Sequence, residues 1–490
     1  MTIKGQFELG RLPLLATSKR ILLTTVACGL FGVLGASSAW AEPLEQALAK
    51  AYSTNPSLDA QRAAVRATDE GVAQARSGYR PQVSATANAG VSRSVTEQTG
   101  GVGTSSTSIN GTFGRTNLTR SLGVTAQQPV YTGGRVPAQV SSAENEVQSQ
   151  RAQLLNAEQQ VLSLAAEAYM NVVRDQATVR LNVSNEQVLR RQMEAAQDRF
   201  RVGEITRTDV SQAESRLARA TADRVTAEGR LSASRAAYTR IVGTPPGELA
   251  APKVGFKLPK NQDEVVDLAL SNNPTVLAAA FSEKARRDDI DVVNADRLPQ
   301  VSVLGSVNRD WTDVESYDRT VSGARPADSR AVTGTVRAQV SVPLYTGGGA
   351  EARVREAKQR ANQQRILIEQ ARRQAVDDAV RNWQNLLTAR AAIESRRAQV
   401  RSAEIALEGV RQEATVGSRT VLDTLDAEQE LLDARVSLVV AERDEVVAAF
   451  DVLQAIGQLT ARQLGLPVEY YDYEAYYNSA RDKWWGTSID

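Results

Sequence analysis

The chain contains no histidine and a single cysteine among its 490 residues. Histidine is the usual side chain for proton transfer near neutral pH, so its absence removes the commonest general acid or base. Zinc sites built on histidine and cysteine ligands are excluded as well. No nucleophile–base pair or metal-ligand cluster stands out in the sequence, so we expect no enzymatic activity, no metal and no cofactor.

Two further absences narrow the class of protein. Lysine and arginine total 58 against 57 aspartates and glutamates, so the charge balance does not indicate a nucleic-acid partner. After Ala41, no stretch approaches the roughly 18 uninterrupted apolar residues of a membrane-spanning helix. An exported protein without such a helix is periplasmic, secreted or an outer-membrane β-barrel, and the strands distinguish these alternatives.

Residues 1–41 predict a secretory signal peptide. Lys19 precedes an apolar run, 21–35, and Ala39-Trp40-Ala41 fits a cleavage site. A signal anchor is one alternative, although the apolar run is short for a membrane span. Lipid attachment at Cys28 is another, although the run continues past that residue. Cleavage after Ala41 would leave a mature protein free of cysteine, which suits an exported chain without disulfides.

The most informative pattern is a turn that occurs twice. Gly203 and Gly417 each follow a long helical pattern, and glycine ends helices because it adopts the left-handed conformation at little cost. Thr208 and Thr420, with the acids that follow them, provide N-cap and first-turn signals for the next helix. Each turn therefore predicts an antiparallel helical hairpin. The two stretches lie 214 positions apart, at 202–214 and 416–428.

The duplication extends well beyond these turns. Asn55-Pro56 recurs as Asn273-Pro274, and Pro129-Val130-Tyr131-Thr132-Gly133-Gly134 recurs as Pro343-Leu344-Tyr345-Thr346-Gly347-Gly348. A repeat that spans nearly the whole mature chain predicts two halves with one design. We place the first structural repeat at 42–260, the second at 261–466, and an aromatic-rich tail at 467–490.

Within each half, two alternating stretches predict strands with one apolar face, and they are followed by a long helix and a shorter one. A helix of about 65 residues would be about 100 Å long. In the first half the strands are expected at about 82–92 and 118–131, and the helices at about 136–201 and 209–242. In the second half the strands are expected at about 300–311 and 331–345, and the helices at about 350–415 and 421–456.

Four strands cannot close a barrel, and open sheet edges cannot face lipid. Several copies of the chain must therefore combine their strands. Two copies give eight strands, whose barrel is filled by side chains, whereas three give twelve strands and room for a lumen. A helical tube about 100 Å long beneath a small barrel would be a duct.

The repeated turns, the Pro-x-Tyr-Thr-Gly-Gly junctions and the Asn-Pro helix stops resemble those of the TolC-type outer-membrane channel-tunnel family, over about 42–466. The resemblance implies an α+β membrane protein. Its homotrimer would form a twelve-stranded transmembrane β-barrel, with four strands from each chain, in the outer membrane of a Gram-negative bacterium. A long periplasmic α-helical barrel would continue the β-barrel, with an equatorial belt built from the inter-repeat and C-terminal segments.

The same resemblance implies the function and the partners. Such proteins are exit ducts of tripartite export systems, joined by a periplasmic adaptor (a membrane fusion protein) to an inner-membrane ABC exporter or RND-type pump. We favour type I protein secretion, since many drug-efflux members carry the lipid anchor that is not expected here. Multidrug or small-molecule efflux with a proton-driven pump is the alternative. A non-conducting periplasmic coiled-coil spacer, anchored to the outer membrane, is the alternative from another class.

Asp423 and Asp426 lie three positions apart, so they share one helix face. They match the family's two aspartates that line the periplasmic aperture. Three copies would place six carboxylates around a narrow opening, which favours cations over anions. Without the resemblance, both would be interpreted as first-turn acids that offset the helix dipole.

Arg419 matches the family arginine that holds the aperture closed, and Thr208 and Asp209 match its partners on the opposing turn. The alternative for Arg419 is a solvated surface arginine. Ala414 departs from the family pattern, because the best-known members have a tyrosine there that adds a second closing contact. By this resemblance, we expect the resting aperture to be held less tightly than in those members.

The tail is rich in aromatic residues, which can mark a membrane interface, a recognition surface or ordinary packing. We favour packing against the middle of the helical tube. The aromatic residues are Tyr470, Tyr471, Tyr473, Tyr476, Tyr477, Trp484 and Trp485.

Overall fold

A computed structural model describes residues 42–98, 111–252, 257–319 and 328–489. The predicted signal peptide and Cys28 lie outside the described residues. Within them, no helix has both the length and the apolar character needed to cross a bilayer.

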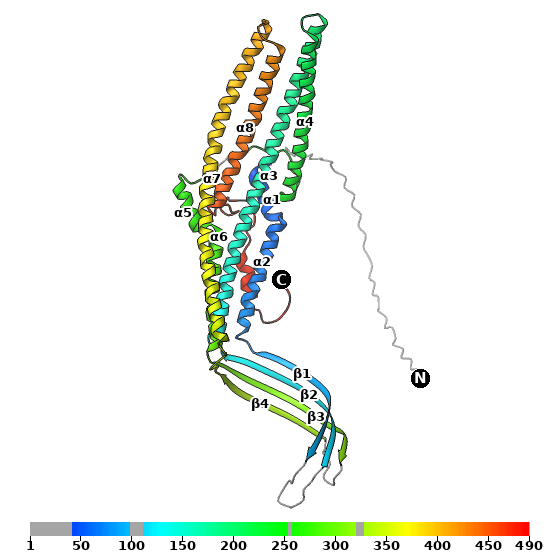
Figure 1. Cartoon of the computed structure of the whole chain (residues 1–490), viewed down its shortest axis with the longest axis vertical. Coiled ribbons are helices and arrows are strands. Elements are labelled where there is room, and N and C mark those ends of the chain that lie inside the picture. The colour runs from blue at the N-terminus through cyan, green and yellow to red at the C-terminus, as the bar shows by residue number, and fades with distance from the viewer. Residues whose placement is uncertain (1–41, 99–110, 253–256, 320–327, 490) are drawn as a thin grey trace, which may run out of the picture. The chain divides into compact units, whose positions relative to one another are not determined.

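The described chain shows the same order of elements twice: two short helices, two strands, a long helix and a shorter one (Figure 1). The first set is α1 (Leu44–Thr54), α2 (Pro56–Ser77), β1 (Gln82–Gln98), β2 (Gly111–Tyr131), α3 (Arg135–Arg201) and α4 (Arg207–Val242). The second set is α5 (Gln262–Asn272), α6 (Pro274–Asn294), β3 (Gln300–Arg319), β4 (Ser329–Ser341), α7 (Gly349–Thr415) and α8 (Val421–Ala455). A short 3₁₀ turn, η1 (Ala295–Arg297), precedes β3, and α9 (Tyr473–Arg481) lies in the tail.

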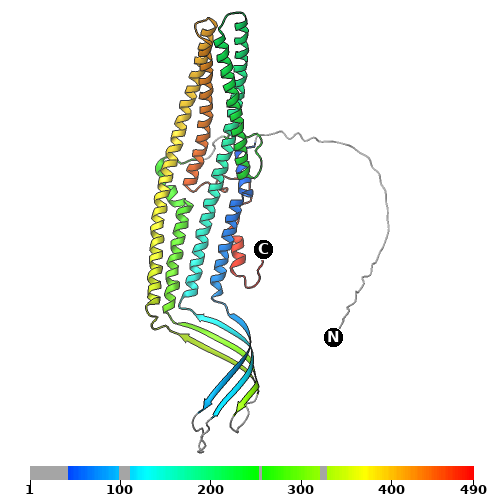
Figure 2. The same ribbon diagram turned by 45° about the vertical axis from the view of Figure 1, so that its right-hand side comes forward.

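The two long helices, α3 and α7, have 67 residues each, which corresponds to a length of about 100 Å. α4 packs on α3 and α8 packs on α7, each after a tight turn at the end far from the sheet (Figure 1). α2 and α6 cover the other half of the long helices, near the sheet (Figure 2). The long helices therefore connect the sheet to the two turns.

The four strands form one antiparallel sheet in the order β1-β2-β3-β4. The register places apolar residues opposite one another, as in the pairs Ala85↔Val124 and Val124↔Val307. These side chains stay exposed: 68% for Val83, 50% for Val124 and 83% for Val336. One face of the sheet is thus an apolar surface that nothing in the described chain covers.

The strands differ from the lengths that alternation predicts. β1 runs to Gln98, β2 begins at Gly111 and β3 runs to Arg319, all well beyond the predicted ends. These extensions lie outside the predicted strands, but their backbone groups continue the ladder, as in Gln98↔Gly111. β4 instead stops at Ser341, two residues before Pro343, whereas β2 continues past the equivalent Pro129 to Tyr131.

The Asn-Pro motifs do more than end a helix. The Asn55 side chain caps α2 by accepting a hydrogen bond from the Ser57 N–H, and Pro56 occupies the first helical position. The Asn55 amide also donates to the Ile241 carbonyl, at 3.0 Å, near the end of α4. In the second half, Asn273 donates in the same way to the Ala455 carbonyl at the end of α8, at 3.1 Å. Each asparagine thus joins the break between two short helices to the end of a hairpin.

The main core lies at this level, where both hairpins meet the short helices. Leu48, Tyr169, Leu386 and Phe450 are almost fully buried there. The Tyr169 hydroxyl lies 2.6 Å from the Glu42 carbonyl oxygen and 2.7 Å from that of Ala250, and burial raises the pKa of Tyr169 to about 12. We call this region, where α1, α5 and residues 456–466 pack around the helices, the middle core.

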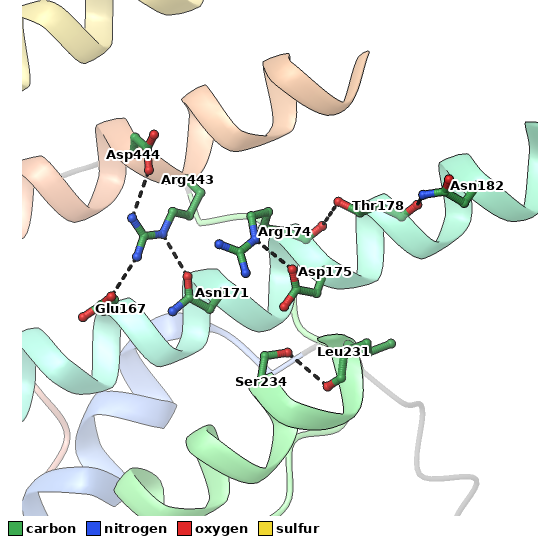
Figure 3. A network of polar contacts seen from close by, with 10 residues as sticks. All are labelled: Glu167, Asn171, Arg174, Asp175, Thr178, Asn182, Leu231, Ser234, Arg443 and Asp444. Carbon is green, nitrogen blue, oxygen red and sulfur yellow. Dashed lines mark hydrogen bonds and ion pairs between the residues drawn. The ribbon is translucent and has the colours of Figure 1, made fainter. Parts of the chain in front are cut away.

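A polar network joins α8 to α3 beside the middle core (Figure 3). The guanidinium of Arg443 on α8 donates to Glu167, at 2.9 Å, and to Asn171, at 3.0 Å, both on α3. It also pairs with its neighbour Asp444. This half-buried arginine fixes the position of one hairpin against the other.

Asp69 on α2 is 1% exposed, and within the described residues neither of its carboxylate oxygens has a hydrogen-bond partner. Burial raises its pKa from 3.8 to about 6, although attraction to Arg151 acts in the opposite direction. The fold therefore favours the protonated form, and stability falls as the pH rises from 3.8 through about 6.

We expect Asp69→Asn to raise the thermal unfolding midpoint at neutral and alkaline pH, and to have little effect at a pH low enough to protonate the native aspartate. Thermal melts of the purified protein across this pH range provide the measurement. Asp59→Asn, an exposed change on the same helix, is the control. A gain that is independent of pH, or equal in both variants, would contradict the role given to burial.

Candidate functional site

The two turns that join the long helices to the next helices are the candidate site, and we call them the hairpin tips (202–206 and 416–420). Gly203 and Gly417 have φ values of 76° and 79°. In the first tip the Glu204 N–H donates to the Arg199 carbonyl, and in the second the Ser418 N–H donates to the Glu413 carbonyl. Both bonds have the Schellman pattern, so the glycines are required by backbone conformation.

The next helix begins in the same way at both tips. Thr206 and Thr420 are the N-caps, and each forms a capping box with Asp209 or Asp423. The Asp423 carboxylate accepts from the Thr420 N–H at 2.9 Å, while the Thr420 hydroxyl accepts from the Asp423 N–H at 3.2 Å. The prediction that Thr208 caps α4 was wrong, because α4 begins earlier and Thr208 lies in its first turn. The Thr-x-x-Asp spacing could have identified Thr206.

Asp423 and Asp426 lie on one helix but have different partners. The hydrogen bonds of the capping box, first that from the Thr420 backbone, lower the pKa of Asp423, so it stays charged. Asp426 instead pairs with Arg216 of α4, with Oδ1 and Nη2 2.5 Å apart. The first carboxylate thus stabilises the start of its own helix, and the second joins the two hairpins.

Arg419 pairs with Glu413 of its own hairpin, with Nε and Oε2 2.8 Å apart. This carboxylate raises the pKa of Arg419 above its usual value. Within the described residues, neither a hydrogen bond nor an ion pair joins Arg419 to Thr208 or Asp209. Sequence reasoning missed Glu413, although it flanks the turn.

A buried carboxylate lies behind the tips. Glu428 on α8 is 7% exposed and accepts from Gln192 of α3 at 3.1 Å and from Arg411 of α7 at 2.5 Å. It therefore ties three helices together. One signal in the sequence could have identified it, because Glu428 lies on the apolar helix face that Leu425 and Leu432 share. Among the described residues, no group of acidic or cysteine side chains is arranged to hold a metal ion.

Comparison with known proteins gives a consistent result. The family model described as "Outer membrane efflux protein" matches residues 47–244 and 265–458. The outer membrane efflux protein BepC of Brucella suis is 34% identical over 457 residues, covering 93% of this chain and 94% of BepC. The outer membrane protein TolC of Vibrio cholerae is 28% identical, covering 91% and 97% of the two chains. The alkaline protease secretion protein AprF of Pseudomonas aeruginosa is 26% identical, covering 59% and 60%.

The fold is also found among solved structures. The outer membrane channel CmeC of Campylobacter jejuni aligns with a TM-score of 0.68, covering 90% of this chain and 89% of CmeC, at 14% sequence identity. At that identity the match concerns the fold alone.

Proposed function

The chain belongs to the outer membrane efflux protein family, and from this premise we propose that three copies form an exit duct across the outer membrane and periplasm. The observation that carries the proposal is the four-stranded sheet. Among the described residues β1 and β4 each pair on one side only, and the apolar face is exposed. Open edges cannot remain unpaired in lipid, so three copies would close a twelve-stranded barrel with a lumen.

The helices would continue this barrel into the periplasm. Each copy contributes α3 with α4 and α7 with α8, and we propose that these two halves are repeats of one structural unit. α3 and α7 are long enough to reach about 100 Å from the sheet. In this arrangement the hairpin tips are the periplasmic end of the duct.

We propose that Asp423 and Asp426 form the ring of charge at this end. The support is their common helix face next to the tip. The structure adds Arg216, whose pairing with Asp426 would compensate part of the ring charge. Arg419, with Thr208 and Asp209, would hold the closed state between neighbouring hairpins, and to do so it must exchange its partner Glu413.

Arg419→Ala is therefore expected to increase the conductance or open probability of the reconstituted channel. Glu413→Ala is the matched control, because it removes the same ion pair but leaves the arginine free to reach the opposing tip. Single-channel recordings of both variants measure the effect. Equal behaviour of the two variants, or conductance unchanged by Arg419→Ala, would eliminate the closing role.

The duct would operate with a periplasmic adaptor and an inner-membrane transporter. We propose type I protein secretion through an ABC exporter, with support from the name of the relative AprF, an alkaline protease secretion protein. The name of BepC, an efflux protein, favours efflux through an RND-type pump as the second candidate. In-cell cross-linking followed by mass spectrometry distinguishes them by the transporter that co-purifies with the tagged chain.

Recording from planar bilayers tests the duct itself. We expect stable, cation-selective conductance from the purified trimer, because the lumen ends in a ring of carboxylates. A protein that inserts without conducting would favour the coiled-coil spacer instead.

A further inference from the structure

The C-terminal tail lies along α2 as far as Trp485, and its last residues then fold back along the same helix, so that Ile489 lies near Ala63 and Arg66. The backbone N–H of Tyr471 donates to the Tyr52 hydroxyl at 3.1 Å, and the Tyr476 hydroxyl donates to Glu70 at 2.8 Å. Further along, Asp482 pairs with Arg76. The tail therefore runs parallel to α2, towards the strands.

Arg80 fixes the end of this path. Its guanidinium donates to the Lys483 carbonyl at 2.8 Å and stacks over the ring of Trp484, 4.5 Å from its centre. Arg80 lies two residues before Gln82, the first residue of β1. The position of Trp484 is thus tied to the junction between the helices and the sheet.

The two tryptophans at this point of the tail are exposed in spite of the fixed position. Trp484 is 64% exposed and Trp485 is 88% exposed. A tail that served only to pack on the helices would bury its largest aromatic side chains. These two rings leave an apolar surface that the described chain does not cover.

Other aromatic residues lie at the same junction. Tyr79 precedes β1, Tyr131 ends β2 and Tyr345 follows β4, with exposures of 53%, 50% and 85%. Exposed tyrosine and tryptophan rings gather where a protein crosses the boundary between lipid and water, and basic side chains often accompany them. Arg80 and Lys483 supply that positive charge here, whereas Asp482 is neutralised by Arg76.

We propose that Trp484 and Trp485 insert into the headgroup region of the periplasmic leaflet and anchor the tail to the membrane. The proposal rests on the exit duct proposed above, since it requires that the sheet crosses the bilayer. Phospholipid is the occupant that fits, because Arg80, which holds Trp484, lies two residues before β1, whose apolar side chains are exposed. The aromatic ring that the strand ends form would thus gain two tryptophans from the tail of each copy.

Quenching of tryptophan fluorescence in proteoliposomes tests the anchor. The chain has five tryptophans, and cleavage after Ala41 would remove Trp40, so one variant replaces Trp311 and Trp383 by phenylalanine and keeps the two in the tail. The vesicles contain phosphatidylcholine brominated at a shallow or a deep acyl position. We expect strong quenching by the shallow bromines and weaker quenching by the deep ones, because the interface is shallow.

A second variant keeps only Trp311, on β3, and reports whether the sheet itself is in the bilayer. Quenching of Trp311 without quenching of the tail would overturn the anchor, leave the exit duct intact and indicate a protein as the occupant of the patch. Absence of quenching in both variants would overturn the membrane-crossing sheet on which the anchor depends.

Arg80→Gln in the tail-only variant tests the fixing contact. Since it removes both the stacking and the charge, we expect the shallow quenching to fall to about half. Arg62→Gln is the matched control, because Arg62 stacks on Tyr471 at the start of the tail, far from the tryptophans. An equal loss in both variants would mean that Arg80 acts only by holding the whole tail.

Discussion

Replacing both Asp423 and Asp426 by asparagine is expected to weaken block of the reconstituted channel by trivalent cations about tenfold or more. A tenfold change corresponds to about 1.4 kcal/mol, which is modest for the loss of six charges around a narrow opening. The measurement is the concentration of a hexammine or lanthanide cation that halves the single-channel current. Unaltered block would remove both aspartates from the constriction.

The two single variants, Asp423→Asn and Asp426→Asn, are expected to differ in how far they weaken the block. Because Arg216 pairs with Asp426, we expect Asp423→Asn to weaken the block more than Asp426→Asn does. Arg216→Gln should strengthen the block, since it leaves the Asp426 carboxylate uncompensated. Asp433→Asn is the control for distance from the tip. Asp433 lies seven residues further along α8 than Asp426, about 10 Å away, where screening by salt reduces its effect on a cation at the aperture. If Arg216→Gln weakens the block, the ion pair does not compensate the ring.

Gly457→Ala is expected to cause the largest loss of assembled protein. Gly457 has a φ of 75°, and a Cβ there would lie 2.3 Å from the Asn272 carbonyl oxygen and 2.7 Å from its carbon. Both atoms are backbone, so they cannot rotate away. The left-handed conformation alone costs an alanine about 1–2 kcal/mol, and the overlap with backbone should bring the total above about 4 kcal/mol.

Two other glycines provide a graded control. A Cβ on Gly465, at φ 63°, would meet nothing within 4 Å, so Gly465→Ala should show the conformational cost alone. At Gly243 the nearest atom is the Thr54 hydroxyl, 2.9 Å away, which belongs to a side chain that can rotate. The expected order of damage is Gly457, then Gly243, then Gly465, measured as heat-resistant oligomer recovered from membranes. Equal recovery of the Gly457 and Gly465 variants would mean that the backbone at Asn272, the end of α5, moves aside at little cost in free energy.

The sequence was most informative where the backbone alone decides the structure. Glycine and proline mark the ends of the long helices, because those positions need a left-handed residue or lack an N–H. The strand ends were underestimated, because backbone pairing between Gln98 and Gly111 needs no alternation of side chains. The helix α9 was not predicted at all, although Asp472 caps it by accepting from the Glu474 N–H.

Side-chain partners at the hairpin tips were the least predictable part. The pair Arg216–Asp426 joins residues 210 positions apart, and it depends on how α4 and α8 are rotated against each other. The pair Arg419–Glu413 depends on the path of the tip itself. The spacing of residues in the sequence specifies neither the rotation of α4 against α8 nor the path of the tip. It therefore identified the charged residues at the tips but not their partners.

The asparagine bonds at the middle core have a mechanical consequence. Asn55 and Asn273 attach the short helices to the C-terminal ends of α4 and α8. Beyond this level each hairpin continues to its tip without the short helices beside it. α4 has 36 residues and is therefore a lever of about 54 Å. A tilt of about 5° at its fixed end moves the tip by about 5 Å. A change too small to disturb the packing of the middle core is thus enough to displace the tip by more than the width of a water molecule.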